Sequence, residues 1–468
     1  MTFPLVEELS SSLDVMRTLK QFAHLPGVLL FDSARSDARL GRYSFLTADP
    51  VEMEVLQRAE FGSDPFASMK ASVDFEPNEP TDVSRSLPPF QGGWAGLLGY
   101  ELGEAWEKLP RPATDEFKMP AMAVGFYDWV IAWDHEQNRC WIVSQGLPET
   151  EPVARAQKAR QRLAMVRALL TLEPTQQTDS REPMLEPPGQ YDMPALAGLK
   201  SNFSEDAYAR ALNQVIEYIY AGDIFQANLS QRLLFPQRQS SIDLYDRLRT
   251  RNAAPFAGYF ACDDWAVLSA SPERFVRVAG REVETRPIKG TRKRSAGPEA
   301  DLFIRDELRE SAKDRAENVM IVDLLRNDLS RVCEPGSIRV PQLCAVETYE
   351  TVQHLVSEIR GTLRPGIDVW ELFAATFPGG SITGAPKIRA MEIIAELEPT
   401  VRGAYCGSLF YSSCSGHADS NILIRTFTCR NGWVQCQAGG GIVADSDPQA
   451  EYEETLHKAD GMIRAFRS

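Results

Sequence analysis

Three kinds of feature are missing from this chain of 468 residues: long runs of basic residues, long apolar segments and closely spaced cysteine pairs. The 50 lysines and arginines are outnumbered by 65 aspartates and glutamates, which gives a formal net charge of −15. A chain this acidic is a poor match for nucleic acid or an anionic membrane surface. If its substrate is an anion, the attraction must come from a local cation cluster or a bound metal.

The other absences concern the cellular compartment. No window reaches the roughly 18 apolar residues that a membrane span requires, and the first residues lack the basic flank and apolar stretch of a secretory leader. The eight cysteines are scattered and none forms a Cys-x-x-Cys pair, which is typical of a reducing compartment. We therefore expect a cytoplasmic protein that binds neither nucleic acid nor membrane.

The amino-terminal part of the chain, residues 1–171, alternates short apolar runs with turn residues. The runs at 28–31, 43–46 and 123–131 predict strands of a mostly antiparallel sheet. Apolar residues at helical spacing predict an amphipathic helix over 152–170, which closes this part.

A change of composition separates the amino-terminal part from the rest of the chain. Residues 172–197 are poor in apolar residues and rich in Pro, Gln and Thr, which indicates a linker or surface excursion. Strands and helices do not alternate regularly in the third part, so we expect an α+β fold whose large, mostly antiparallel sheets pack with helices in a two-layered, β-sandwich-like core. This third part covers 198–468, with helices expected over 204–222, 301–327, 385–397 and 447–466.

The expected last helix places two acids and a lysine on one face. Glu451, Glu454 and Lys458 stand at positions i, i+3 and i+7. Such groups are most often solvated ion pairs. A glycine triplet, Gly439–Gly441, precedes the helix and lets backbone approach a ligand closely, which favours a binding site over a plain surface pair.

A third acid, Glu317, lies among apolar residues of the helix expected over 301–327. A carboxylate near a buried face is costly unless it is paired or metal-bound. Two glutamates from separate helices, completed by substrate oxygens and water, would suit Mg2+. Asp323 and Asp328 are alternative ligands, although capping or salt-bridge roles are favoured for both.

A lysine and a glycine-rich loop complete the candidates. Lys289 follows an expected strand in a segment bounded by Pro and Gly, where Gly290 and Thr291 can supply donors to a carboxylate. A lone lysine is most often a surface charge. The loop 377–387 has the general form of an anion cradle, but it lacks the Gly-Lys-Ser/Thr ending of a Walker A loop.

Eight blocks of sequence carry a resemblance to a known family. They resemble, in order and spacing, the chorismate-utilising enzymes, which include anthranilate, aminodeoxychorismate, isochorismate and salicylate synthases. The resemblance implies the fold of anthranilate synthase component I. The blocks are 41–45 (GRYSF), 91–100 (QGGWAGLLGY), 271–275 (SPERF), 286–291 (RPIKGT), 323–328 (DLLRND), 378–387, 424–426 (IRT) and 439–458.

Within that family one position separates the chemistries. Anthranilate synthases carry Ala where this chain has Lys289, whereas aminodeoxychorismate synthases carry Lys. The resemblance therefore implies amination of chorismate at C4, with Lys289 as a covalent nucleophile. It also implies Glu273 as the acid that protonates the leaving C4 hydroxyl, and His354 beside the C4 oxygen, although a core histidine is the alternative for His354.

The resemblance further implies a metal and a substrate site. Mg2+ would be held by Glu317 and Glu454, with Glu451 bridging through water. The implied substrate-binding residues are Gly290, Thr291, Ser381, Tyr405, Arg425, Gly441 and Lys458.

Two alternatives and a partner follow from the same resemblance. The chain could be anthranilate synthase component I, which Lys289 disfavours, or a catalytically silent chorismate or tryptophan sensor, which the intact acid, nucleophile and metal ligands disfavour. Ser33 falls where the family's tryptophan pocket begins, although the usual Leu-Leu-Glu-Ser run is absent. No cysteine lies in the Gly-x-Cys-x-Gly turn of a glutamine amidotransferase, so ammonia would come from solution or from a separate glutaminase subunit in a heterodimer.

Overall fold

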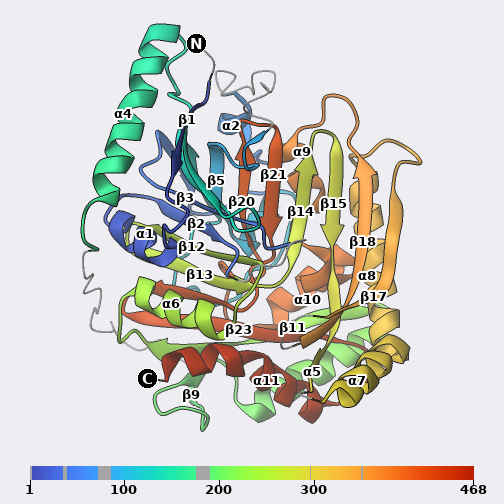
Figure 1. The fold of residues 1–468 in the computed structure, drawn as a ribbon. Helices are drawn as coiled ribbons and strands as arrows, with labels where there is room; N and C mark the ends of the chain where they lie inside the picture. Colours follow the sequence, from blue (N-terminus) through green and yellow to red (C-terminus); the bar gives the residue numbers. More distant parts are fainter. Residues whose placement is uncertain are drawn as a thin grey trace.

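Two large antiparallel sheets face each other, and helices cover their outer sides (Figure 1). The computed structural model describes residues 3–34, 40–71, 86–174, 190–295, 297–348 and 352–467. Within these residues one sheet has 13 strands and the other has 10. The expected α+β fold with a two-layered core of antiparallel sheets is confirmed.

The larger sheet joins strands from residues 5–144 with strands from residues 191–442. Its order is β1 (Leu5–Leu9), β8 (Arg139–Ser144), β7 (Trp129–Asp134), β3 (Tyr43–Thr47), β2 (Val28–Asp32), β12 (Phe256–Cys262), β13 (Trp265–Ser271), β22 (Thr426–Arg430), β23 (Trp433–Ile442), β11 (Gln226–Pro236), β10 (Lys200–Ser201) and β9 (Tyr191–Asp192), with β19 (Gly384–Ala385) also pairing with β11.

The smaller sheet also combines strands from distant parts of the chain. Its order is β16 (Ile288–Lys293), β18 (Val352–Thr362), β15 (Glu282–Arg286), β14 (Arg274–Ala279), β21 (His417–Asn421), β20 (Ser408–Ser413), β5 (Gly93–Leu98), β6 (Met122–Tyr127) and β4 (Glu52–Leu56), with β17 (Arg339–Thr348) also pairing with β18. Residues 1–171 and 198–468 thus contribute strands to both sheets. The boundaries proposed at 171 and 197 stay predictions, and residues 175–189 of the expected linker lie outside the described residues.

The helices pack on the two outer faces of the sheets (Figure 1). No described helix is both long and apolar enough to cross a membrane. The helices are α1 (Val15–Phe22), α2 (Ala67–Ala71), α4 (Pro152–Leu170), α5 (Glu205–Tyr220), α6 (Ser241–Arg251), α7 (Pro298–Glu310), α8 (Ala312–Ser330), α9 (Val369–Thr376), α10 (Lys387–Leu397) and α11 (Pro448–Phe466), with short 3-10 turns η2 (Tyr100–Ala105) and η3 (Gly380–Ile382).

One expected helix is wrong in its extent. The stretch 301–327 is not continuous: α7 ends and α8 begins at Ser311, whose ψ of 106° is not helical. The Ser311 hydroxyl accepts a hydrogen bond from the Asp314 N–H at 3.3 Å, so a serine inside the apolar pattern acts as a new N-cap.

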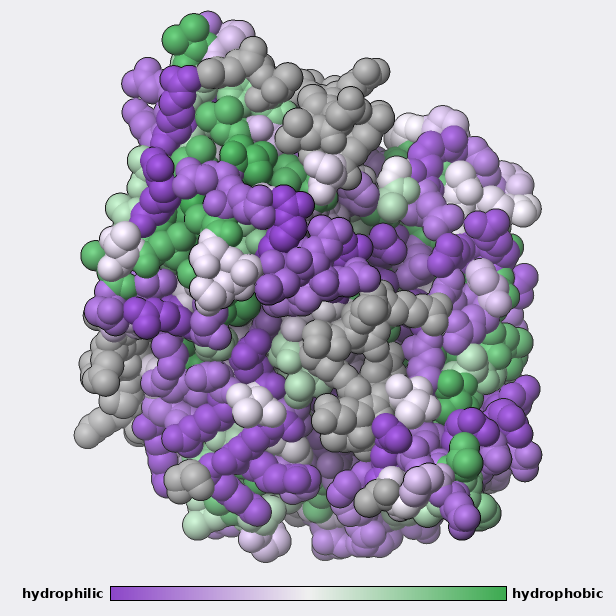
Figure 2. Space-filling model, in the orientation of Figure 1, coloured by the Kyte–Doolittle hydropathy of each residue, from purple (hydrophilic) through white to green (hydrophobic). Residues whose placement is uncertain are grey.

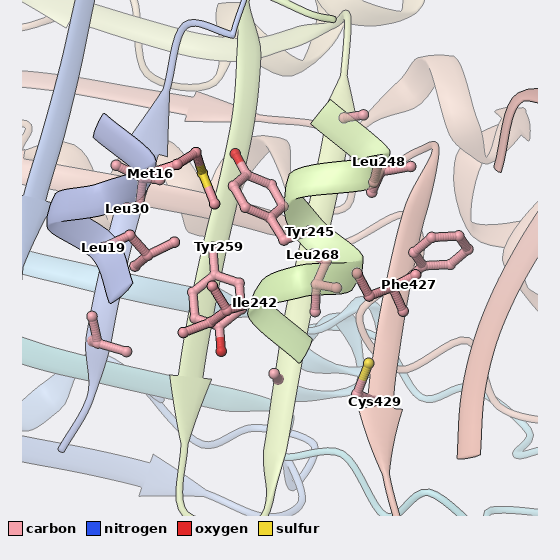
Figure 3. Close-up of a cluster of buried hydrophobic side chains, with 14 of the residues drawn as sticks. Met16, Leu19, Leu30, Ile242, Tyr245, Leu248, Tyr259, Leu268, Phe427 and Cys429 are labelled. Atoms are coloured by element: carbon pink, nitrogen blue, oxygen red, sulfur yellow. The ribbon is translucent and has the colours of Figure 1, made fainter. Parts of the chain in front are cut away.

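Apolar packing joins these layers. Figure 3 shows the core under the larger sheet, where α1 and α6 place Leu19, Ile242 and Leu248 against sheet residues such as Leu268 and Phe427. A second cluster, which includes Leu29, Phe45, Leu97, Phe260 and Leu409, lies between the sheets. On the face drawn in Figure 2 hydrophilic residues predominate and apolar residues gather beside α4.

Candidate active site

Lys289 lies on β16, at a break in the pairing with β18. Lys289 is opposite Leu355 and Thr291 is opposite His354, so Gly290 forms a bulge between them. Gly290 has a φ of +73°, and a Cβ there would lie 2.9 Å from the Asp314 carboxylate and from Leu308. The strand can therefore turn at this point only with glycine, and this bulge sets where Lys289 stands.

The Lys289 amine makes no direct ion pair in the part of the chain that the structure describes, although the charges of Glu317, Glu273 and Glu454 act on it. No ion pair or hydrogen bond links its Nζ to any residue that the structure describes. Burial lowers the pKa of Lys289, and the nearby charges of Glu317 and Glu273 only partly oppose this effect. A larger share of neutral amine at a given pH makes this lysine a better nucleophile than an exposed one.

Glu273 stands between β13 and β14 with 4% of its surface exposed. Burial raises the pKa of Glu273 to about 7, although hydrogen bonds from the Ser381 hydroxyl and the Ile288 N–H and the charge of Lys289 favour the ionised form. Ser381 comes from η3 in the glycine-rich loop. A carboxyl group that is half protonated near neutral pH can act as a general acid.

His354 is buried on β18, opposite Thr291 of β16. Its Nδ1 lies 2.8 Å from the Thr291 hydroxyl, so Thr291 fixes the orientation of the imidazole. The Thr291 hydroxyl, expected to bind a substrate carboxylate, is thus also engaged by the protein.

The acids of α11 face the glycine triplet at the end of β23. A Cβ on Gly440 would lie 3.1 Å from Glu451 Oε2 and 3.8 Å from Glu454 Oε1. Lys458 Nζ is 2.6 Å from Glu454 Oε1 and donates to the Gly439 carbonyl at 2.9 Å. The structure therefore brings the three predicted α11 side chains to one small space that glycine leaves open.

Glu317 reaches the same group from α8. Burial raises the pKa of Glu317, the charge of Lys289 opposes this rise, and the charge of Glu451 adds to it. Helices α7, α8 and α11 approach one another at the lower right of Figure 1. Glu317 is thus electrostatically coupled both to the lysine and to the α11 acids.

The donor set fits a hard divalent cation that retains other ligands. No three acidic, histidine or cysteine side chains converge as a complete metal site anywhere in the described parts of the chain. Mg2+ needs no such cage, because it is commonly held by one or two carboxylates together with water and substrate oxygens. Glu317 and Glu454, with Glu451 beside Glu454 on α11, could hold it in that way.

Arg425 is a candidate for binding an anion. It precedes β22 with a φ of +52°, and no hydrogen bond or ion pair of its guanidinium occurs with the residues that the structure describes. Burial lowers the pKa of Arg425. A desolvated guanidinium without a counter-ion favours a carboxylate ligand.

Two other residues predicted to bind the substrate, Tyr405 and Gly441, contact other protein residues. Tyr405 is 6% exposed and its ring lies 5.5 Å from the Arg402 guanidinium. Gly441 approaches Gln226, since a Cβ on Gly441 would lie 2.1 Å from Gln226 Nε2.

The rival metal ligands are engaged elsewhere. Asp328 pairs with Lys387 at 2.6 Å, and Asp323 pairs with Arg326 at 3.0 Å. Lys387 also donates to the Thr376 carbonyl at 2.9 Å, so the lysine that ends the glycine-rich loop holds the protein together in this structure.

Ser33 lies apart from this group. It follows β2, which three strands separate from β23, a distance of about 19 Å at the usual strand spacing. Its hydroxyl donates to the Tyr43 carbonyl at 2.6 Å, and the adjacent Asp32 pairs with Arg249 at 2.7 Å.

One charged residue at the site escaped sequence reasoning. Lys313, on the first turn of α8, has its Nζ 3.5 Å from Glu451 Oε1 on α11. Its i, i+4 spacing to Glu317 was the available signal, but that spacing does not reveal that α11 packs alongside.

Comparison with known proteins assigns this chain to a family. The chorismate binding enzyme family matches residues 31–464. Aminodeoxychorismate synthase component 1 of Escherichia coli (strain K12) is 39% identical over 455 residues, which cover 95% of this chain and 94% of the relative. The protein of that name from Klebsiella aerogenes is 43% identical over 380 residues, which cover 81% and 78%.

Other relatives have a different name. Anthranilate synthase component 1 of Streptomyces coelicolor is 38% identical, with 97% of this chain and 87% of the relative covered. The crystal structure of anthranilate synthase component I from Streptococcus pneumoniae TIGR4 superposes with a TM-score of 0.75 at 29% identity, covering 90% of this chain and 92% of that one. The expected anthranilate synthase I-like fold is confirmed, and the chain belongs to the family of chorismate binding enzymes.

Proposed function

We propose that this chain is the aminating component of an aminodeoxychorismate synthase, which converts chorismate and ammonia to 4-amino-4-deoxychorismate on the route to 4-aminobenzoate and folate. Overall identity does not decide this, because relatives named for anthranilate synthesis reach 38% and 39%, and relatives named for aminodeoxychorismate synthesis reach 39% and 43%. Lys289 carries the proposal, since the anthranilate synthases that the chain resembles have Ala there.

The Lys289 amine attacks C2 of chorismate while the C4 oxygen leaves. Glu273 donates the proton that turns the leaving hydroxyl into water, and the amine loses a proton once the new C–N bond has formed. Ammonia then attacks C4, the new ammonium gives up one proton, the Lys289 nitrogen takes up one proton, and the bond between C2 and Lys289 breaks to release the neutral amine. The desolvated amine and an acid whose pKa is about 7 support this pair of roles.

Binding of the substrate uses the remaining cations. Arg425 and Lys458 hold carboxylates of chorismate, and His354, oriented by Thr291, contacts the C4 oxygen. Mg2+ bound by Glu317 and Glu454 would neutralise a substrate carboxylate and stabilise negative charge that develops as the ring reacts.

Ammonia comes from a separate glutaminase component. The relatives are named component 1, which supports a second component for this chain. Burial raises the pKa of the partly exposed Cys414 thiol to about 12, so this cysteine is a poor nucleophile for hydrolysing glutamine.

A product assay tests the proposal. The protein is incubated with chorismate, Mg2+ and an ammonium salt, and the products are separated by chromatography. We expect 4-amino-4-deoxychorismate; anthranilate or isochorismate as the main product would contradict the assignment. Glutamine should replace the ammonium salt only when a partner glutaminase is added.

A further inference from the structure

Two lysines neutralise the acids that are proposed to bind Mg2+. Lys458 pairs with Glu454 within α11 at 2.6 Å, whereas Lys313 reaches across from α8 to Glu451 at 3.5 Å. The Lys313 charge also lowers the pKa of both Glu317 and Glu454. A single cation on α8 thus acts on all three carboxylates of the group.

The two ends of the Lys313 contact differ in exposure. The Glu451 side chain is 6% exposed, whereas the Lys313 side chain is 56% exposed. The carboxylate cannot move into water, but the lysine can, because its flexible stem already lies at the surface. The Ser446 hydroxyl donates to the same Glu451 oxygen at 2.7 Å, so that oxygen keeps a donor when the lysine leaves.

We infer that Lys313 is a displaceable counter-ion: it neutralises the carboxylates in the metal-free protein and moves into solvent when Mg2+ binds. The inference rests on the proposed Mg2+ site. It makes Lys313 a competitor of the metal and a positioning residue that holds α8 to α11 until the metal replaces it.

Removing this charge should strengthen metal binding. We expect Lys313→Gln to bind Mg2+ about two- to fivefold more tightly than the wild-type protein, which is the range that an exposed ion pair supplies. Lys313→Arg keeps the charge and should retain the wild-type affinity. Arg326→Gln is the matched control, because Arg326 is 52% exposed on the same helix and pairs with the exposed Asp323.

Titration of the intact protein with MgCl2 alone, followed by calorimetry and by thermal unfolding, measures this difference. Lys313→Gln should lower the Tm without metal and increase the rise in Tm that Mg2+ causes, while Arg326→Gln changes neither. An unchanged or weaker Mg2+ affinity in Lys313→Gln, beside normal binding by the wild-type protein, overturns the counter-ion role and leaves the proposed function intact. If the wild-type protein binds no Mg2+, the proposed metal site is wrong and this inference falls with it.

Discussion

Lys289 and Lys387 are two partly buried lysines with opposite surroundings. Burial lowers the pKa of both. Lys387 pairs with Asp328 at 2.6 Å and donates to the Thr376 carbonyl, whereas Lys289 makes no ion pair or hydrogen bond with any described residue. A buried charge that is fully paired serves the fold, and one that is left unpaired has a cost that only a function explains.

The same contrast extends over the smaller sheet. Behind Glu273, Arg274 pairs with both Glu284 and Asp419 at 2.9 Å, and the next buried arginine, Arg286, pairs with two glutamates. Arg425, which is predicted to bind the substrate, has no such partner among the described residues. Paired charges therefore characterise the scaffold, and charges without a described partner characterise the candidate active site.

Replacing Lys289 should have the largest effect. Lys289→Ala removes the nucleophile, so we expect the amination rate to fall by about 10⁴-fold or more while the Tm stays the same or rises, because a desolvated amine has gone. Intact-protein mass spectrometry should find no chorismate-dependent mass increase in this variant. An adduct that persists would place the nucleophile at another residue.

Replacing the acid Glu273 should have the second-largest effect on the rate. Glu273→Gln should lower the amination rate by about 10² to 10⁴-fold. In the wild-type protein the rate should decline as the pH rises through about 7, since the protonated form of Glu273 is the one that acts. A rate profile without this decline would assign the acid role elsewhere.

Stability gives an independent check on Glu273. Its folded pKa of about 7 lies above the ordinary glutamate value of 4.5, so the unfolded chain releases this proton first and stability is lost as the pH rises between those values. Glu273→Gln should therefore stabilise the protein more at pH 8 than at pH 5. Equal shifts in Tm at the two pH values would contradict the raised pKa.

Replacing Lys387, the paired lysine, should reduce stability, whereas replacing Lys289 should reduce the rate. Lys387→Met leaves Asp328 buried without a partner, which should reduce the free energy of unfolding by about 3 to 5 kcal/mol, as measured by denaturant titration. The double variant Lys387→Met/Asp328→Leu should recover much of this loss. If Lys387→Met abolished activity at unchanged stability, the distinction between the two lysines would fail.

Local patterns made much of the fold predictable. The helix expected over 152–170 coincides with α4, and the Ser204 cap of α5 accepts a hydrogen bond from Ala207 N–H as its sequence suggests. Helical spacing also placed Glu451, Glu454 and Lys458 on one face. These features depend on residues within one or two turns of each other.

Contacts between distant segments were not predictable in this way. The glycines of 377–387 favour an anion cradle. Nothing in that loop predicts that Lys387 pairs with Asp328, which lies 59 residues earlier in the chain. Lys313 and Glu451 are 138 residues apart, and only the packing of α8 beside α11 joins them. A sequence pattern indicates which face of a helix is polar, but not which face lies opposite to it.

The glycine triplet offers the smallest test of the same contrast. A Cβ on Gly439 would lie 2.5 Å from the Leu229 carbonyl oxygen, which is backbone and cannot yield, whereas a Cβ on Gly440 would meet side chains of the proposed metal site at 3.1 Å or more. We expect Gly439→Ala to cost about 1 to 3 kcal/mol of stability. Gly440→Ala should instead keep a nearly wild-type Tm and bind Mg2+ about tenfold more weakly, as measured by calorimetric titration. Equal losses of stability in the two variants would mean that Gly440 serves packing alone, because a residue that leaves room for a ligand should be dispensable to the fold in the ligand's absence.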